Sequence, residues 1–179
     1  IDMQNIFADP SSDWYTKDIE TIVPKISQLV EKFSPSVVFT KFISAKDPKG
    51  AWQAYYQDWP KALVPPTDAI WDIIPELADA AGKVTGWNGE ATTIDKTTFG
   101  KFGSEFATLL DFDDEVYLCG VSTDCCVIAT AIGLIDQGYK TYIIEDACKG
   151  MDKESENAAV HTMSLFGPIC EIVQTDQIL

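Results

Sequence analysis

Residues 115–144 read EVYLCGVSTDCCVIATAIGLIDQGYKTYII, and this stretch decides the fold. Its first five residues, Glu115–Cys119, are mostly apolar or aromatic and end at a glycine, which predicts a buried strand. Residues 123–136 are mostly apolar over a helical length and stop before Gly138. Lys140–Ile144 then predicts another strand. Strand, helix and strand in this order form a crossover unit, so the two strands are expected to be parallel.

The same alternation continues outward along the chain. The clearest helix is expected at Asp18–Phe33, where apolar residues recur at 3.6-residue spacing and Ser34-Pro35 follows. Further segments are expected as helices at 67–81, 104–110 and 152–166, and as strands at 37–40, 91–95 and 169–173. Right-handed crossovers would place helices on both faces of such a sheet. Residues 1–179 show no repeat or linker and are expected to form a single domain.

Residues 41–66 interrupt this pattern, because they are rich in Trp, Tyr, Lys and Pro. We expect a long irregular loop here. Long loops inside compact domains usually carry function, which favours a role in binding. A surface flap whose aromatic side chains pack on the body or on a partner subunit explains the composition equally well.

Composition excludes several classes of protein. The net charge of −15 would repel nucleic acid, so no nucleic-acid partner is expected. No apolar run reaches the ~20 residues of a membrane helix, and no signal peptide is visible. The five cysteines have no C-x-x-C spacing, which gives no support to a disulfide framework or a zinc site. A cytoplasmic location is expected. The sequence starts Ile1-Asp2 without Met, and residues before it are expected to be missing.

Ligands of parallel sheets bind beyond the carboxyl ends of the strands, which directs attention to residues that follow strands. Cys126 lies in the first turn of the helix after Gly120. The positive end of a helix dipole favours a thiolate, and free N–H groups there hold an oxyanion. Two buried structural thiols at a tight turn would give the same pattern. Asp2 and Lys96 also follow strands and would supply a proton acceptor and a cation; the single histidine, His161, lies mid-helix and is not expected to act as a base.

Three segments resemble the isochorismatase-like hydrolases. Residues 1–7, IDMQNIF, resemble the family's D-x-Q-x-x-F opening. Residues 95–102, DKTTFGKF, resemble its lysine segment, and residues 120–131, GVSTDCCVIATA, resemble its G-V-x-T-x-x-C-V-x-x-T-A nucleophile segment. Residues 138–148 are similar to the strand and D-A-C that follow. The motifs occur in family order and span nearly the whole chain.

The resemblance implies an α/β fold: a three-layer, Rossmann-like sandwich with a six-stranded parallel sheet and helices on both faces. It implies an Asp2–Lys96–Cys126 triad and selects Cys126 over its neighbour Cys125 as nucleophile. It also implies a cis peptide between Val121 and Ser122, in a turn where N–H groups near Ser122 and Cys126 bind the oxyanion. The expected activity is hydrolysis of a C–N bond in a small amide or ureido substrate through a thioester. A homo-oligomer is expected, since oligomers are common in this superfamily.

The sequence also departs from better-known members of that superfamily. Nicotinamidases carry a D-x-H-x-x-H-like metal cluster after the second strand, whereas residues 41–47 read KFISAKD, so neither metal nor cofactor is expected and nicotinamidase activity is in doubt. Candidate walls of the substrate pocket are Phe7, Trp52, Tyr55 and Trp87. Two alternatives stay open: a vinyl-ether hydrolase of the isochorismatase type that does not use the thiol, and a non-catalytic binding or scaffold protein with the same fold.

Overall fold

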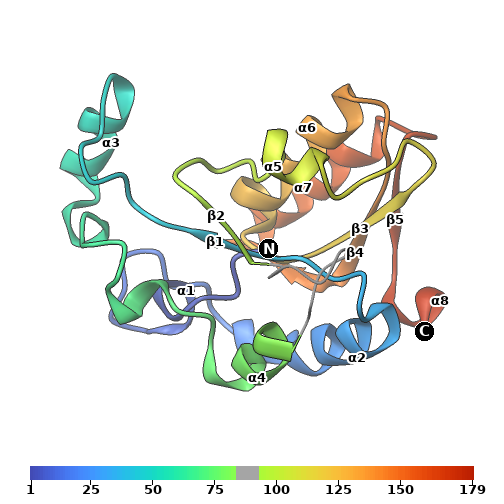
Figure 1. Cartoon of the computed structure of the whole chain (residues 1–179), viewed down its shortest axis with the longest axis horizontal. Coiled ribbons are helices and arrows are strands. Elements are labelled where there is room, and N and C mark those ends of the chain that lie inside the picture. The colour runs from blue at the N-terminus through green and yellow to red at the C-terminus, as the bar shows by residue number, and fades with distance from the viewer. Residues whose placement is uncertain (84–92) are drawn as a thin grey trace.

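The computed structural model describes residues 1–83 and 93–179 (Figure 1). In this part of the chain, parallel strands form two small sheets. One sheet pairs β1 (Phe39–Phe42) with β2 (Thr93–Lys96), and the other has the order β3 (Glu115–Val121), β4 (Lys140–Lys149), β5 (Cys170–Val173). The α/β class is confirmed. The prediction of one six-stranded sheet was wrong, because the described residues form a two-stranded and a three-stranded sheet.

The first two residues lie between β1 and β3 and connect the two sheets (Figure 1). The backbone nitrogen of Ile1 donates to the Cys119 carbonyl at 2.7 Å, and the Ile1 carbonyl accepts from Val121 N–H at 3.1 Å. On the other side, Asp2 N–H donates to the Thr40 carbonyl at 3.2 Å. Asp2 has a φ of 48°, outside the extended region, so no strand continues through it. Ile1 and Asp2 therefore bridge β3 and β1 by hydrogen bonds while the two sheets stay separate.

Gly120 makes this close approach possible. A Cβ atom at residue 120 would stand 2.1 Å from the Ile1 carbonyl oxygen, and the φ of Gly120 is +115°. Both the space and the backbone conformation therefore require glycine.

Helices lie on both sides of the strands, with α2 and α4 on one side and α5, α6 and α7 on the other (Figure 1). The α-helices are α1 (Asn5–Ala8), α2 (Val23–Phe33), α3 (Ala51–Asp58), α4 (Pro75–Lys83), α5 (Ser104–Ala107), α6 (Ile128–Asp136), α7 (Lys153–Ser164) and α8 (Thr175–Ile178). Short 3-10 turns occupy Ile19–Thr21, Pro60–Ala62 and Ala69–Trp71. The helix expected to start at Asp18 starts instead at Val23, because Pro24 lacks an N–H and fits only the first turn. No helix in residues 1–83 and 93–179 is long and apolar enough to cross a membrane.

The core has two clusters, and neighbouring residues of β4 point into different ones. Ile143 belongs to the cluster with Leu134 of α6 and Met163 of α7. Ile144 belongs to the cluster with Leu29 of α2 and Trp71. The three-stranded sheet is therefore buried on both faces, as its near-continuous apolar strands predict.

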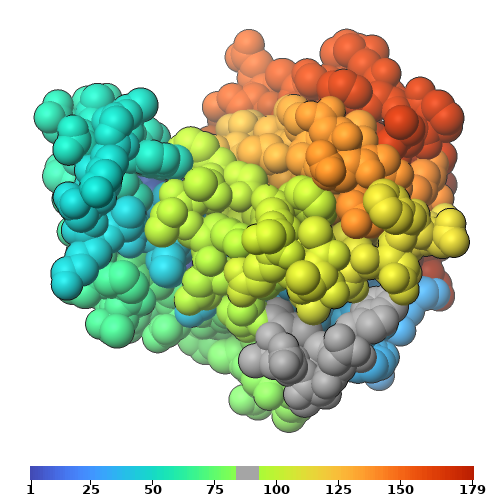
Figure 2. Space-filling view, turned by 45° about the horizontal axis from the view of Figure 1, so that its top comes forward, coloured from blue at the N-terminus to red at the C-terminus, as the bar shows by residue number. Residues whose placement is uncertain are grey.

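Residues 41–66 are not wholly irregular, since they contain α3 and the 3-10 turn Pro60–Ala62. Helix α3 stands out from the body as a separate arm (Figure 1; Figure 2, teal). Trp52, Tyr55, Tyr56 and Trp59 have the i, i+3, i+4, i+7 spacing of one helix face, a helical signal despite the surrounding Lys and Pro residues.

Candidate active site

A fully buried ion pair joins Asp2 to Lys101. Asp2 Oδ2 lies 2.8 Å from Lys101 Nζ, and both side chains are 0% exposed. The other carboxylate oxygen, Oδ1, accepts a 2.7 Å hydrogen bond from Thr40 Oγ1. Lys101 Nζ also donates to the Thr98 carbonyl at 3.0 Å and lies 5.1 Å from the centre of the Phe42 ring. Buried charges are tolerated only when paired and hydrogen-bonded, and each of these two has such partners.

Gln4, two residues after Asp2, fixes the start of the chain. Its amide nitrogen donates to the carbonyls of Phe42 and Trp71, at 2.9 and 2.7 Å, and its amide oxygen accepts from Phe42 N–H at 2.8 Å. The side chain is fully buried. Three short hydrogen bonds thus hold the segment that carries Asp2 against the end of β1.

Cys126 lies in a single π-helical turn, Thr123–Val127, between β3 and α6. The Ser122 carbonyl accepts from Cys125 N–H at 3.0 Å and from Val127 N–H at 3.1 Å, which closes this wide turn. The peptide bond between Val121 and Ser122 is cis. Turns of this kind inside helices occur frequently at functional sites.

The two neighbouring thiols are electrostatically different. The pKa of Cys126 lies well above its ordinary value because of its hydrogen bond with Cys125, its burial and the negative charge of Asp2, which together outweigh Lys101. The pKa of the more exposed Cys125 is lowered, mainly by its hydrogen bond with Cys126 and further by Lys101. Cys126 therefore rests as a protonated thiol. The charges of Asp2 and Lys101 both act on this pair. Thr130 Oγ1 is hydrogen-bonded to both Lys101 N–H and the Cys126 carbonyl, so the ion pair lies near the thiols.

Aromatic side chains from α3 form a wall beside these charges. Trp52 lies 5.0 Å from Phe99 and 5.3 Å from Tyr55 between ring centres, and Phe99 lies 6.0 Å from Phe42. Burial, and then the charges of Cys125 and Cys126, raise the pKa of Tyr55, so this phenol lies near the thiol pair. The aromatic side chains of α3 therefore lie beside the candidate site of the same chain.

The isochorismatase domain family matches residues 1–175. The chain belongs to the isochorismatase family. Among curated relatives, isochorismatase domain-containing protein 2 of Xenopus laevis is 26% identical over 147 residues, 79% of this chain and 67% of that protein. A nicotinamidase of Acinetobacter baylyi is 49% identical over 39 residues, 22% of this chain and 18% of that enzyme.

Solved structures of the family have the same fold. An isochorismatase-like hydrolase from Alkaliphilus metalliredigens superposes with a TM-score of 0.78 at 22% identity, covering 99% of this chain and 93% of that one. A nicotinamidase/pyrazinamidase from Bacillus subtilis gives 0.78 at 19% identity, covering 97% and 96%. The chain is thus an isochorismatase-family hydrolase.

The lysine that faces Asp2 in this isochorismatase-family protein is not the expected one. Lys96 is the last residue of β2, and its Nζ lies 2.9 Å from Glu105 Oε2 of α5 with the side chain 22% exposed. Lys101, and not Lys96, forms the ion pair with Asp2 that was expected of the catalytic lysine. Both lysines belong to the segment DKTTFGKF, and position at a strand end favours Lys96. No pattern within the segment favours Lys101 over Lys96.

The other expected pocket residues have different positions. Phe7 stacks on Trp14 at 6.0 Å, and Trp14 in turn lies 6.1 Å from Tyr55, so Phe7 supports the wall from behind. Trp87 lies outside the described residues. Thr123, in the turn before Cys126, has a buried hydroxyl that bonds to no other part of residues 1–83 and 93–179.

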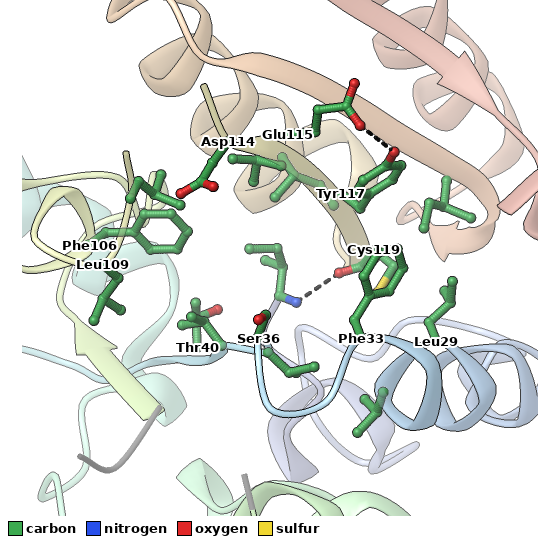
Figure 3. A pocket seen from close by; sticks show the side chains of 18 of the residues that line it. Leu29, Phe33, Ser36, Thr40, Phe106, Leu109, Asp114, Glu115, Tyr117 and Cys119 are labelled. Carbon is green, nitrogen blue, oxygen red and sulfur yellow. Dashed lines mark hydrogen bonds between the residues drawn. The ribbon is translucent and has the colours of Figure 1, made fainter. Parts of the chain in front are cut away.

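A cavity of about 290 Å³ lies elsewhere, along β3 between Phe33 of α2 and Phe106 of α5 (Figure 3). Neither Asp2, Lys101 nor Cys126 lines it. Cys119 does, but burial raises the pKa of its thiol and makes it a weak nucleophile. Among the described residues, no three His, Cys, Asp or Glu side chains gather as metal ligands.

Proposed function

We propose that this hydrolase cleaves the C–N bond of a small amide or ureido substrate through a thioester on Cys126. The observation that carries the proposal is the buried Asp2–Lys101 ion pair, whose charges both act on the Cys126 thiol. A thiol nucleophile needs a nearby base and a setting that accepts the charges formed during attack. The nicotinamidases among the similar proteins, which by name act on an amide, support this class of reaction.

In the proposed mechanism, Asp2 accepts the Cys126 thiol proton as Sγ bonds to the substrate carbonyl carbon. Backbone N–H groups near Ser122 and Cys126 hold the oxygen that becomes negative. The tetrahedral adduct then collapses, the C–N bond breaks, and the amine leaves with the proton from Asp2. Water attacks the thioester, Asp2 takes a proton from it, and the acid product leaves as Cys126 regains its thiol. Lys101 balances the charge of Asp2 in those stages in which the Asp2 carboxylate is ionised.

Because the hydrogen bond with Cys125, burial and the charge of Asp2 raise the pKa of Cys126, the proposed attack needs a base that acts during bond formation, and we assign that role to Asp2. The sequence contains one histidine, His161, and the KFISAKD segment at 41–47 supplies no histidine ligands. The proposed reaction therefore uses only side chains of this chain, without a histidine base or histidine-bound metal.

The test is release of ammonia from a panel of small carboxamides and N-carbamoyl acids by wild type, Cys126→Ala and Cys125→Ala. We expect Cys126→Ala to lower kcat by about 10³-fold or more, and Cys125→Ala by less than about tenfold. Ammonia release that survives in Cys126→Ala would show that the hydrolysis does not use this thiol. A wild-type protein that hydrolyses none of the panel would favour the binding or scaffold alternative.

A further inference from the structure

The segment that carries Lys101 lies directly on α6, with very little side chain between the two backbones. A Cβ atom at Gly100 would stand 3.1 Å from the Ala129 carbonyl oxygen. One turn further along α6, a Cβ atom at Gly133 would stand 3.2 Å from Phe102 Cβ. Two glycines, one on each partner, thus allow the close contact on either side of Lys101.

At the centre of this contact stands the hydroxyl of Thr130. Its Oγ1 accepts a hydrogen bond from Lys101 N–H at 3.0 Å and donates one to the Cys126 carbonyl at 2.7 Å. The residue is fully buried. A threonine inside a helix often donates to the carbonyl four residues earlier, so the second bond is common. The first bond, to a distant segment of the chain, is the unusual one.

We propose that Thr130 is a positioning residue that sets the backbone of Lys101 against the backbone of Cys126. The inference rests on the proposed function. One hydroxyl joins the main chains of the cation and the nucleophile, although it touches neither the thiol nor the ammonium group. If the bond to Lys101 N–H is lost, the lysine backbone is free to shift along α6, and the 2.8 Å contact between Nζ and Asp2 shifts with it.

The decisive variants are Thr130→Val, which keeps the shape and removes both hydrogen bonds, and Thr130→Ser, which keeps the hydroxyl. Thr162 of α7 supplies a matched control, because its hydroxyl donates to the Ala158 carbonyl at 2.8 Å in the same i−4 pattern but on an exposed helix face. Thr130→Ala removes the hydroxyl with less bulk and replaces Thr130→Val if that variant does not fold.

The experiment measures kcat, KM and melting temperature for each variant on the amide that wild type hydrolyses best. We expect Thr130→Val to lower kcat by about 10- to 100-fold with KM within about threefold, since misplacement of catalytic groups by ~1 Å costs this much. Thr130→Ser should restore kcat to within about threefold of wild type, and Thr162→Val should leave it unchanged.

Two other outcomes would overturn the inference, and they can be distinguished from each other. A lower melting temperature for Thr130→Val with wild-type kcat would show that Thr130 only stabilises the fold, and the proposed function would stand. Full activity in Cys126→Ala, or none in wild type, would remove the proposed function and this inference with it.

Discussion

Asp2 Oδ2 and Lys101 Nζ lie 2.8 Å apart, and neither side chain reaches solvent. The two residues are distant in sequence, and the fold brings them together at the ends of β1 and β2. Loss of one partner leaves the other as an unpaired buried charge, which is far more costly than loss of an exposed pair.

The first prediction compares Lys101→Ala with Lys96→Ala. Lys101→Ala should lower the free energy of unfolding by about 3–5 kcal/mol, because Asp2 loses its buried partner. Lys96→Ala breaks a solvent-accessible pair with Glu105 and should cost no more than about 1 kcal/mol. Urea unfolding followed by circular dichroism measures both, and kcat/KM on an amide substrate should fall strongly only for Lys101→Ala. Equal effects of the two variants would contradict the assignment of Lys101.

The second prediction concerns Gly120, whose missing Cβ leaves room for the Ile1 carbonyl. Gly120→Ala should destabilise the fold by about 3 kcal/mol or more, because it adds a clash to a positive φ and displaces Asp2. Gly138→Ala is the matched control, since Gly138 has a φ of +88° but nothing within 4 Å of an added Cβ. That variant should cost only about 1–2 kcal/mol of backbone strain. Similar losses in urea unfolding would mean that the contact with Ile1 is unimportant.

Local pattern was sufficient to predict much of this architecture. The strands expected at 115–119, 140–144 and 169–173 correspond to β3, β4 and β5, although β4 runs on to Lys149. The spacing of apolar residues and the position of turn residues are local properties of the sequence. A parallel sheet buried on both faces follows from them. The sheet count was not predictable in this way, because it depends on hydrogen bonds between distant segments, such as those of Ile1 and Asp2 with β3 and β1.

In the site, too, local sequence pattern predicts some residues, whereas contacts between distant segments decide others. Cys126 follows β3, and the charges of Asp2 and Lys101 both act on its thiol; the catalytic roles of these residues stay predictions. The identity of the cation depends on how the segment after β2 folds back onto α6. This path is set by the contacts of Gly100 with Ala129 and of Lys101 with Thr130, which no spacing within the segment reveals.

The third prediction is a loss of stability in alkaline solution. Burial raises the pKa of Cys119, Cys148 and Cys170, the last to about 11, and hydrogen bonding and burial raise that of Cys126. The folded protein therefore keeps protons that the unfolded chain releases above the ordinary thiol pKa of about 8.5. The stabilising effect is complete below that pH and is lost as the pH rises toward the folded values.

Urea unfolding at several pH values checks this prediction. Each such thiol should contribute a slope of up to about −1.4 kcal/mol per pH unit to the unfolding free energy above pH ~8.5. Cys170→Val removes one of these thiols and should reduce the slope between pH ~8.5 and ~11. A free energy of unfolding that does not change between pH ~7 and ~10 would contradict the buried, protonated state of these thiols.

The last prediction assigns substrate contact to the α3 arm. Trp52 packs on Phe99 and on Tyr55, whose phenol lies near the thiol pair, so we expect the Trp52 ring to contact a planar substrate. Trp52→Ala should raise KM for an aromatic carboxamide about three- to tenfold, the loss expected for one aromatic contact, and should change KM for a small aliphatic amide much less. Phe112→Ala is the control, because Phe112 is 79% exposed and stacks on Tyr139, outside the aromatic cluster of α3. Equal KM values for Trp52→Ala and wild type on both substrates would show that the arm stabilises the fold without contacting substrate.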